Sequence, residues 1–376
     1  MTFALTLPAR IRFGRGESLA AASELAALGR RPLVLHGRSA APVAARLADA
    51  LRAEGADPLV HQAPTGEPDL PGLVAALDAT RPAAADAVIA IGGGAALDLG
   101  KALAALLPDP GDPLDHLEVV GAGLPLDRAP LPFAAVPTTA GTGAEATSNA
   151  VIGVPEHARK VSLRDPGLMA RIAVVDPALT EGVPEGVRLA SGLDAVVQVI
   201  EPFLSRRANP LTDALCRDAI PRGLSALRRV VEAPDARAFD DMALTALMGG
   251  IALANAGLGA VHGFAGVVGG RTGAPHGAIC GRLLAPVLRA NASAAGGARA
   301  DAVAGWIGDA FGVPAMRALD ALEAWIDAYG LPRLAALGVG PDDHAEIATA
   351  ARAASSMRSN PVDLDDSALR AILAEA

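Results

Sequence analysis

In the first half of the chain, short runs of consecutive apolar residues alternate with longer amphipathic segments rich in alanine. The apolar runs predict buried strands, and they lie at 32–37, 57–62, 86–94, 131–143 (a strand and its loop together) and 171–177. The amphipathic segments predict helices, and they lie at 40–55, 70–80 and 95–107. This alternation predicts a mostly parallel sheet with helices on both faces, whose ligands bind beyond the carboxyl ends of the strands.

The pattern changes after about residue 185, beyond which every periodic segment is helical. Segments rich in Ala and Leu, separated by Gly and Pro, predict helices at 187–204, 210–232, 236–257, 278–293, 300–311, 314–328, 341–358 and 366–375. A chain of 376 residues is also too long for one small core. We therefore expect an α/β domain at 1–184 and an all-helical domain at 185–376, with a site in the cleft between them.

The composition is typical of a packed globular protein, with 51% hydrophobic and 19% charged residues. No uninterrupted apolar run is long enough to cross a bilayer, and the amino terminus does not resemble a signal peptide. The two cysteines, Cys216 and Cys280, lie far apart and do not indicate a disulfide framework, which fits a cytoplasmic protein. A net charge of −9 argues against a nucleic-acid partner.

Two loops that follow predicted strands have the residues of a nucleotide site. The glycines 92–94 would let a phosphate approach the backbone at a helix amino terminus. The loop after the next strand offers the hydroxyls of Thr138, Thr139 and Thr142. Two alternatives remain open: the glycines form only a tight turn, and Thr142 with Glu145 forms a helix capping box.

The stretch "SGLDAVVQVIEPFLS" at 191–205 places Asp194, Gln198 and Glu201 on one face of a predicted helix. Asp194 is a candidate metal ligand on that face. Ser191 followed by Asp194 three residues later is also close to a capping box, so Asp194 could instead be a carboxylate at a helix start.

Several motifs occur in order along the chain: "GGGAALDLGK", "PTTAGTGAEAT", "DPALT", "SGLDA", "HGFAG" and "PHGAICGRLLAPVL". Together they resemble the iron-containing (group III) alcohol dehydrogenase family, which shares a fold with glycerol dehydrogenase and dehydroquinate synthase. The resemblance extends from "IRFGRG" at 11–16 to "SSMRSNP" at 355–361. It implies a Rossmann-like dinucleotide-binding domain followed by a helical domain that binds metal and substrate.

The resemblance implies NAD or NADP as cofactor, held by residues of the first domain. These are Gly93, Gly94 and Ala95 at the pyrophosphate, Asp98 near the nicotinamide ribose, Thr138, Thr139 and Thr142 along the nucleotide, Lys160 at the ribose and Leu179 at the adenosine. Ala95 stands where the family usually has serine. The chain has only two lysines, and both match family positions: Lys101 ends "GGGAALDLGK", and Lys160 lies in "HARKVSL" at 157–163.

The choice between NAD and NADP depends on the end of the first predicted strand, where Gly37, Arg38 and Ser39 follow each other. Enzymes strict for NAD commonly hold a carboxylate there, which repels a 2′-phosphate. Gly37 removes that repulsion, and Arg38 could pair with the phosphate. The alternative is that Arg38 is a solvated loop arginine.

The resemblance also implies one divalent metal, Fe²⁺ or Zn²⁺. Asp194, His262 and His276 match three of the four usual ligands and would be the catalytic residues, while Gln198 stands where the family has histidine. Gln198 could lend an amide oxygen or hydrogen-bond a metal-bound water. Gly266 stands where many members have a proton-relay histidine, so the resemblance identifies no proton donor.

The implied function is an NAD(P)-dependent, metal-assisted alcohol dehydrogenase, or aldehyde or ketone reductase, acting on a small, aliphatic molecule. One alternative is a dehydroquinate synthase-like lyase or cyclase, with Arg206, Arg207 and Arg271 gripping a phosphorylated substrate. Another is a non-catalytic nucleotide-binding relative, in which Gln198 and Gly266 are signs of decay. The resemblance implies a homodimer or larger homo-oligomer, and we expect no nucleic-acid or membrane partner.

Overall fold

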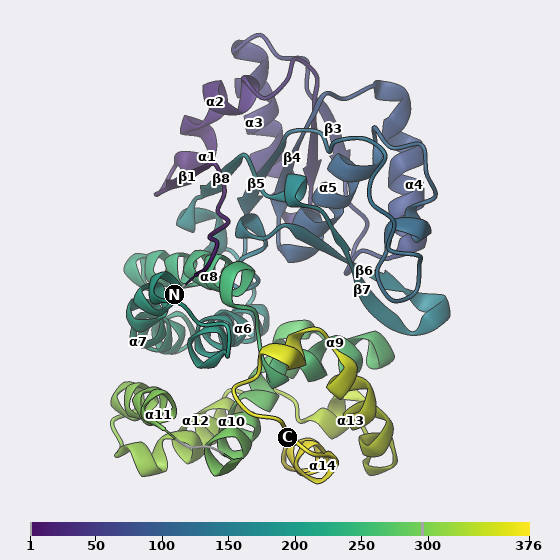
Figure 1. The fold of residues 1–376 in the computed structure, drawn as a ribbon. Helices are drawn as coiled ribbons and strands as arrows, with labels where there is room; N and C mark the ends of the chain where they lie inside the picture. Colours follow the sequence, from purple (N-terminus) through teal and green to yellow (C-terminus); the bar gives the residue numbers. More distant parts are fainter. Residues whose placement is uncertain (1, 295–296) are drawn as a thin grey trace. The chain divides into compact units, whose positions relative to one another are not determined.

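The computed structural model describes residues 2–294 and 297–376, which form two compact units (Figure 1). The α/β unit comprises Leu7–Thr139 and Gly143–Gly182. The helical unit comprises Val183–Ala376, together with Ala140–Thr142 and the residues before Leu7. The predicted fold class, a parallel-sheet domain followed by a helical domain, is confirmed.

A six-stranded parallel sheet forms the centre of the α/β unit, with the strand order β1-β8-β5-β4-β2-β3. Its strands are β1 (Arg10–Phe13), β2 (Pro32–His36), β3 (Leu59–Gln62), β4 (Ala87–Gly92), β5 (Phe133–Pro137) and β8 (Ile172–Val175). The sequence pattern predicted all of them except β1. That strand lies at the sheet edge and is mostly exposed, so its residues do not form an apolar run.

Helices cover both faces of this sheet, as predicted. Leu33 and Leu35 of β2 pack into the core that contains α4 (Leu70–Thr80) and α5 (Gly94–Leu106). Val34 points the opposite way, into the core with α1 (Glu17–Ala20), α2 (Ala22–Ala26) and α3 (Ala41–Ala53). The sequence pattern missed an antiparallel hairpin of β6 (Asn149–Val154) and β7 (Arg159–Arg164).

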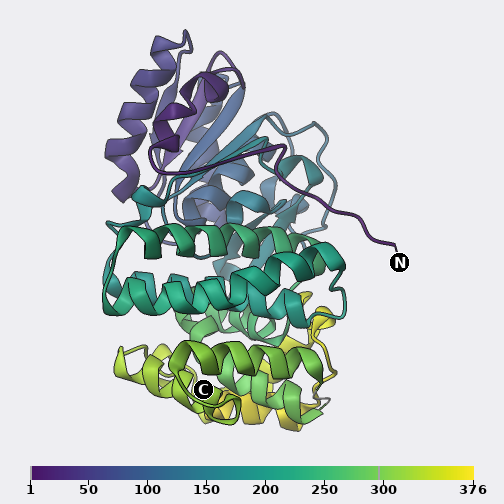
Figure 2. The same cartoon turned by 90° about the vertical axis from the view of Figure 1, so that its left-hand side faces the viewer.

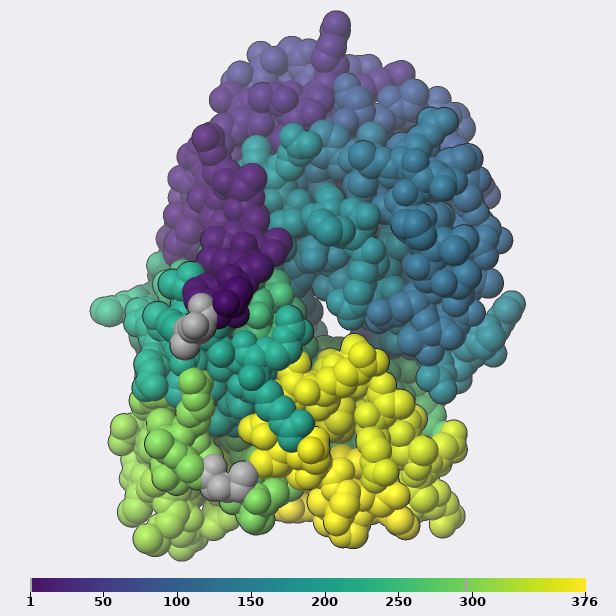
Figure 3. Space-filling view, viewed as in Figure 1, coloured from purple at the N-terminus to yellow at the C-terminus, as the bar shows by residue number. Residues whose placement is uncertain are grey.

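The helical unit consists of α-helices that pack on one another (Figure 2). They are α6 (Glu185–Leu204), α7 (Pro210–Glu232), α8 (Ala236–Ala256), α9 (Ala260–Thr272), α10 (His276–Ala294), α11 (Ala298–Phe311), α12 (Ala318–Ala328), α13 (His344–Ala353) and α14 (Asp366–Glu375). The prediction omitted α9, whose glycines lower its intrinsic helix propensity. The carboxy-terminal residues, yellow in Figure 3, form part of the surface of this unit.

None of the helices in the described part of the chain has both the length and the apolar composition of a membrane span. α8 and α9 meet those criteria only as a pair, and the two helices meet at an angle of 100°.

Lys101, on α5, is the largest fully buried side chain of the α/β unit. Its ammonium donates hydrogen bonds to Thr147 Oγ1 at 2.7 Å and to the Asn149 carbonyl at 3.0 Å. Burial lowers the pKa of Lys101 to about 8, although the carboxylates of Asp98 and Glu145 oppose this change. Burial also raises the pKa of Glu145 to about 7, against the effect of Lys101. The ammonium of Lys101 and the carboxylate of Glu145 therefore each favour the charged form of the other, in opposition to the effect of burial.

This burial predicts how stability depends on pH. The folded-state pKa of Lys101 lies below its unfolded value of 10.5, so the unfolded chain binds more protons between pH 8 and 10.5 and stability rises with pH. Relative to Lys101→Met, the free energy of unfolding of the wild type should increase by about 1.5 kcal/mol between pH 8 and about pH 9.5. Urea unfolding of the wild type and of Lys101→Met at a series of pH values measures this difference in the free energy of unfolding. Two parallel stability–pH curves would contradict a buried ammonium at residue 101.

Candidate metal centre

Three helices of the helical unit bring four metal-binding side chains together. α6 contributes Asp194, α9 contributes His262, and α10 contributes His276 and Cys280. One ligand atom from each residue lies within 4.8 Å of all the others. We call these four residues the Asp–His–His–Cys cluster. Three of its members are the metal ligands predicted from the sequence, and Cys280 is an addition.

The positions along the helices explain this convergence. Asp194 lies in the middle of α6, which begins at Glu185, so the capping-box alternative for Asp194 is wrong. Ser191 instead donates its hydroxyl to the Arg188 carbonyl, one turn earlier in the same helix. His276 begins α10 and Cys280 follows four residues later, so both side chains project from one face of that helix.

The distances within the cluster fit a shared cation. His262 Nε2 and His276 Nε2 lie 3.4 and 3.8 Å from Asp194 Oδ1, an oxygen that is buried without a hydrogen-bond partner in the described structure. Cys280 Sγ lies 3.5 Å from His276 Nε2 and 3.9 Å from His262 Nε2. Ligand atoms of one tetrahedral zinc ion are about 3.3–3.6 Å apart at the usual bond lengths. The donor set therefore fits a divalent metal.

A buried carboxylate orients His262. Glu201 Oε2 lies 2.7 Å from His262 Nδ1, and Glu201 Oε1 accepts a hydrogen bond of 2.7 Å from the Val261 N–H. Because a carboxylate accepts, the Nδ1 atom carries a proton, and in the neutral imidazole the lone pair lies on Nε2, which faces Asp194 and Cys280. Glu201 thus fixes both the tautomer and the ring orientation that metal binding requires.

Gln198 lies one turn after Asp194 and contacts it directly. Its amide nitrogen donates to Asp194 Oδ2 at 2.8 Å and to the Gly141 carbonyl at 3.3 Å. Both neighbours are acceptors, so the NH₂ group must face them. The amide oxygen Oε1 is buried without a hydrogen-bond partner among the described residues. Gln198 therefore anchors Asp194 through its nitrogen and leaves its oxygen available.

The cluster is strongly coupled electrostatically. Burial opposes a charge on His276, yet the Cys280 and Asp194 side chains outweigh burial and raise the pKa of His276 to about 9. The pKa of His262 is also raised, since Cys280, Asp194 and Glu201 outweigh its burial. Burial disfavours the Asp194 carboxylate, but His276 and His262 more than compensate and lower the pKa of Asp194. The carboxylate thus requires positive charge beside it, from protons or from a metal.

In the α/β unit, the predicted nucleotide residues gather at the carboxyl ends of the strands. Gly37 follows β2 and donates its N–H to the Ile91 carbonyl at 2.9 Å. Thr138 follows β5 and donates its N–H to the Gly92 carbonyl at 2.9 Å. A Cβ on Gly93 would lie 3.4 Å from Thr139, so these loops are in close contact. Leu179 lies in the short 3₁₀ helix Pro177–Thr180 that follows β8.

The first turns of α5 carry Gly94, Ala95 and Asp98, and no side chain caps its amino terminus at Gly93. A helix end of this kind has N–H groups free for a phosphate. Arg38 and Ser39 are exposed just after β2.

Two further predicted nucleotide residues, Lys160 and Thr142, do not directly follow a strand of the parallel sheet. Lys160 lies on the β6–β7 hairpin and forms an ion pair with Glu67. Thr142 groups with the helical unit. The nearby 3₁₀ turn Ala144–Ala146 has Gly143, and not Thr142, at its N-cap position.

Two residues of the metal centre, Cys280 and Glu201, were not predicted as part of it, although the sequence places both at suitable helical spacings. Cys280 follows His276 by four residues, which is the spacing of two ligands on one helix face. Glu201 shares the helix face of Asp194 and Gln198, but the sequence did not show that His262 would lie beside it. Only the packing of α9 against α10 and α6 supplies that information.

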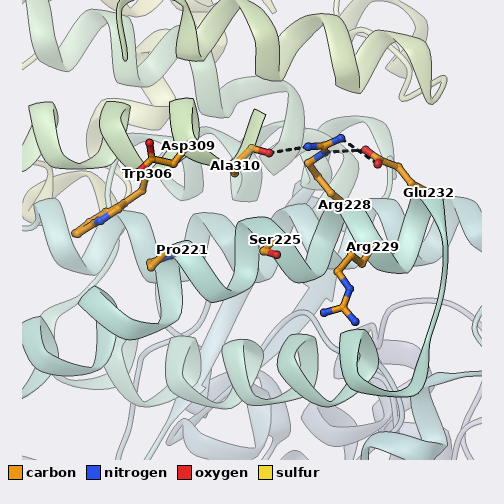
Figure 4. A pocket seen from close by; sticks show the side chains of 8 residues that line it. All are labelled: Pro221, Ser225, Arg228, Arg229, Glu232, Trp306, Asp309 and Ala310. Atoms are coloured by element: carbon orange, nitrogen blue, oxygen red, sulfur yellow. Dashed lines mark hydrogen bonds and ion pairs between the residues drawn. The ribbon is translucent and has the colours of Figure 1, made fainter. Parts of the chain in front are cut away.

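A separate cavity of about 390 Å³ in the helical unit contains none of these residues (Figure 4). It is lined by Pro221, Ser225, Arg228, Arg229, Glu232, Trp306, Asp309 and Ala310. Arg228 pairs with Glu232, and Arg229 pairs with Asp235. Because its arginines are already neutralised, we assign the cavity no ligand.

Known proteins resemble the chain over most of its length. It is 38% identical to the probable alcohol dehydrogenase EutG of Salmonella typhimurium over 252 residues, which are 67% of this chain and 63% of that protein. It is 34% identical to lactaldehyde reductase of Escherichia coli, over 76% of this chain and 74% of that protein. The solved structure of an alcohol dehydrogenase from Oenococcus oeni has a TM-score of 0.89 and 27% identity, with both chains covered completely.

Two family patterns account for nearly the whole chain. "Iron-containing alcohol dehydrogenase" matches residues 8–177, and "Fe-containing alcohol dehydrogenase family, C-terminal" matches residues 188–376. These two segments include the glycine motif after β4 and all four residues of the Asp–His–His–Cys cluster. The chain therefore belongs to the iron-containing alcohol dehydrogenase family.

Proposed function

We propose that the protein is an NAD(P)-dependent, metal-assisted oxidoreductase that interconverts an alcohol with an aldehyde or ketone. The observation that carries this proposal is the convergence of Asp194, His262 and His276, with Asp194 Oδ1 buried and without a hydrogen-bond partner within the described residues. Family membership implies a nicotinamide dinucleotide and a divalent metal. Relatives named alcohol dehydrogenase and lactaldehyde reductase support the class of reaction.

The metal-holding residues have distinct tasks. Asp194, His262 and His276 would bind the metal, and Glu201 keeps the His262 lone pair directed at it. Gln198 anchors the second oxygen of Asp194, so that Oδ1 faces the cluster, and its own Oε1 is available as a weak further ligand. When bound, a divalent metal polarises the carbonyl oxygen of a substrate. The His276 side chain is 32% exposed, so the cluster has a side open to a small molecule.

The proposed cofactor site is formed by the loops at the carboxyl ends of the parallel strands. Gly93, Gly94 and Ala95 would surround the pyrophosphate at the uncapped start of α5. The Asp98 carboxylate would accept a hydrogen bond from a hydroxyl of the nicotinamide ribose. The bound nicotinamide would supply or take up the hydride. The remaining contacts would come from Thr138, Thr139, Thr142, Lys160 and Leu179. Gly37 leaves room for a 2′-phosphate, and the exposed Arg38 beside it favours NADP(H) as a second acceptable cofactor.

The lyase alternative receives less support from the charges of the helical unit. Two of the three arginines named for it are engaged: Arg206 pairs with Asp363, and Arg271 pairs with Asp343 and Glu346. Arginines neutralised by carboxylates have little capacity left for a phosphorylated substrate. A substrate turned over with no net change in NAD(P)H would favour this alternative.

Replacing Asp194 tests the metal directly. Asp194→Ala should lower metal content from about one equivalent to near zero and reduce NAD(P)H-dependent aldehyde reduction at least about 100-fold, because outer-shell losses alone cost about 10–100-fold. Elemental analysis and steady-state kinetics measure both effects. Asp218→Ala, which changes an exposed aspartate of α7, is the control and should behave as wild type. An Asp194→Ala protein that keeps its metal and activity would contradict the proposal.

Arg38 provides a test of cofactor choice. Arg38→Ala should raise the KM for NADPH about 10-fold or more, because one charge-assisted hydrogen bond to the 2′-phosphate is lost. The KM for NADH should stay unchanged, because NADH has no 2′-phosphate. Arg46→Ala, at an exposed arginine of α3, serves as the matched control. Equal shifts for both cofactors, or none for either, would show that Arg38 does not contact a 2′-phosphate.

A further inference from the structure

The ligand set of this chain differs from the set that the family resemblance implies. An imidazole is lost at Gln198, and a thiol is gained at Cys280. The thiol is buried and lies on the same helix as His276, one turn further on. The cluster therefore keeps four strong donor atoms in spite of the lost histidine.

The position of Cys280 Sγ suits direct ligation. It lies 3.5 Å from His276 Nε2 and 3.9 Å from His262 Nε2. A nitrogen and a sulfur on one tetrahedral zinc ion are about 3.5 Å apart. An octahedral ion with bonds of about 2.1 Å would bring neighbouring ligand atoms to about 3.0 Å. The four distances from 3.4 to 3.9 Å all exceed the spacing of neighbouring octahedral ligands and lie near the tetrahedral spacing.

Gln198 cannot take the place of the lost imidazole with equal strength. Its amide nitrogen is committed to Asp194 and Gly141, which leaves only the neutral oxygen Oε1. An amide oxygen is a hard and weak donor, whereas a thiolate is soft and binds zinc tightly. The strongest donor available to complete the set is consequently the Cys280 sulfur.

We infer that the Cys280 thiolate is the fourth ligand of the metal, which makes the centre an Asp–His–His–Cys site of the zinc type. The inference rests on the proposed function for the presence of a metal, and it adds the ligand and the metal class. On binding, Sγ loses its proton to solvent and forms the metal–sulfur bond. Zinc in catalytic sites can accept a fifth ligand, so four protein donors still leave a place for a carbonyl oxygen.

The second cysteine of the chain offers a matched comparison. Cys216 is buried in α7, where burial raises the pKa of its thiol to about 12. It does not belong to the Asp–His–His–Cys cluster. Because the chain has two cysteines, a thiolate bound to the metal must come from one of them.

The test uses the full-length protein, stripped with a chelator and loaded with one equivalent of cobalt(II). A cobalt–thiolate bond produces a charge-transfer band in the near ultraviolet, which nitrogen and oxygen ligands do not. The wild type and Cys216→Ser should show this band. Cys280→Ser should lack it and should bind zinc at least about 100-fold more weakly, a loss beyond that of an outer-shell change.

Cobalt bound to the wild type without the band, or a band lost in Cys216→Ser, would overturn the inference while the proposed function stands. A wild type that binds neither cobalt nor zinc would overturn both. If Cys280→Ser does not fold, the wild type and Cys216→Ser still decide the question, since a band that survives in Cys216→Ser can come only from Cys280.

Discussion

The buried carboxylate of Asp194 is the group on which the arrangement of the metal centre depends. Its residue is only 2% exposed and lies in the middle of an apolar helix, where an uncompensated charge would be costly. One oxygen is satisfied by the Gln198 amide, and the other faces two imidazoles and a thiol. The charge of this carboxylate is therefore compatible with the fold only if a cation, or protonated neighbours, lie beside it.

The surrounding structure supports this one requirement. Glu201 joins the end of α6 to the start of α9 and orients His262. α10 presents His276 and Cys280 from consecutive turns. In the α/β unit, Lys101 and its carboxylate neighbours are a second buried charge cluster, which links α5 to the loop before β6. Both units thus place their buried charges next to the elements assigned to function.

The periodicity of the sequence was sufficient to predict most of the fold. The apolar runs of β2, β4 and β5 are buried on both faces of the sheet, which is why they stand out as continuous hydrophobic segments. The edge strand β1 and the half-exposed hairpin β6–β7 lack that pattern, and the glycine-rich α9 lacks helix propensity.

The metal centre, too, could be predicted only where local sequence motifs identify its residues. Asp194, His262 and His276 were predicted through motifs, whereas the pairing of Glu201 with His262 joins residues 61 positions apart in the sequence. No local pattern contains such a contact. Cys280 lies within a recognised motif, but its role depends on the approach of α9 and α6 to α10, which only the tertiary packing establishes.

The most direct test of the metal centre is X-ray absorption spectroscopy at the metal edge of protein purified without added metal or chelator. The account predicts zinc with one sulfur at about 2.3 Å and three nitrogen or oxygen ligands at about 2.0–2.1 Å. A metal coordinated by nitrogen and oxygen alone would contradict an Asp–His–His–Cys site. The protein ligands would then be Asp194, His262 and His276 without Cys280.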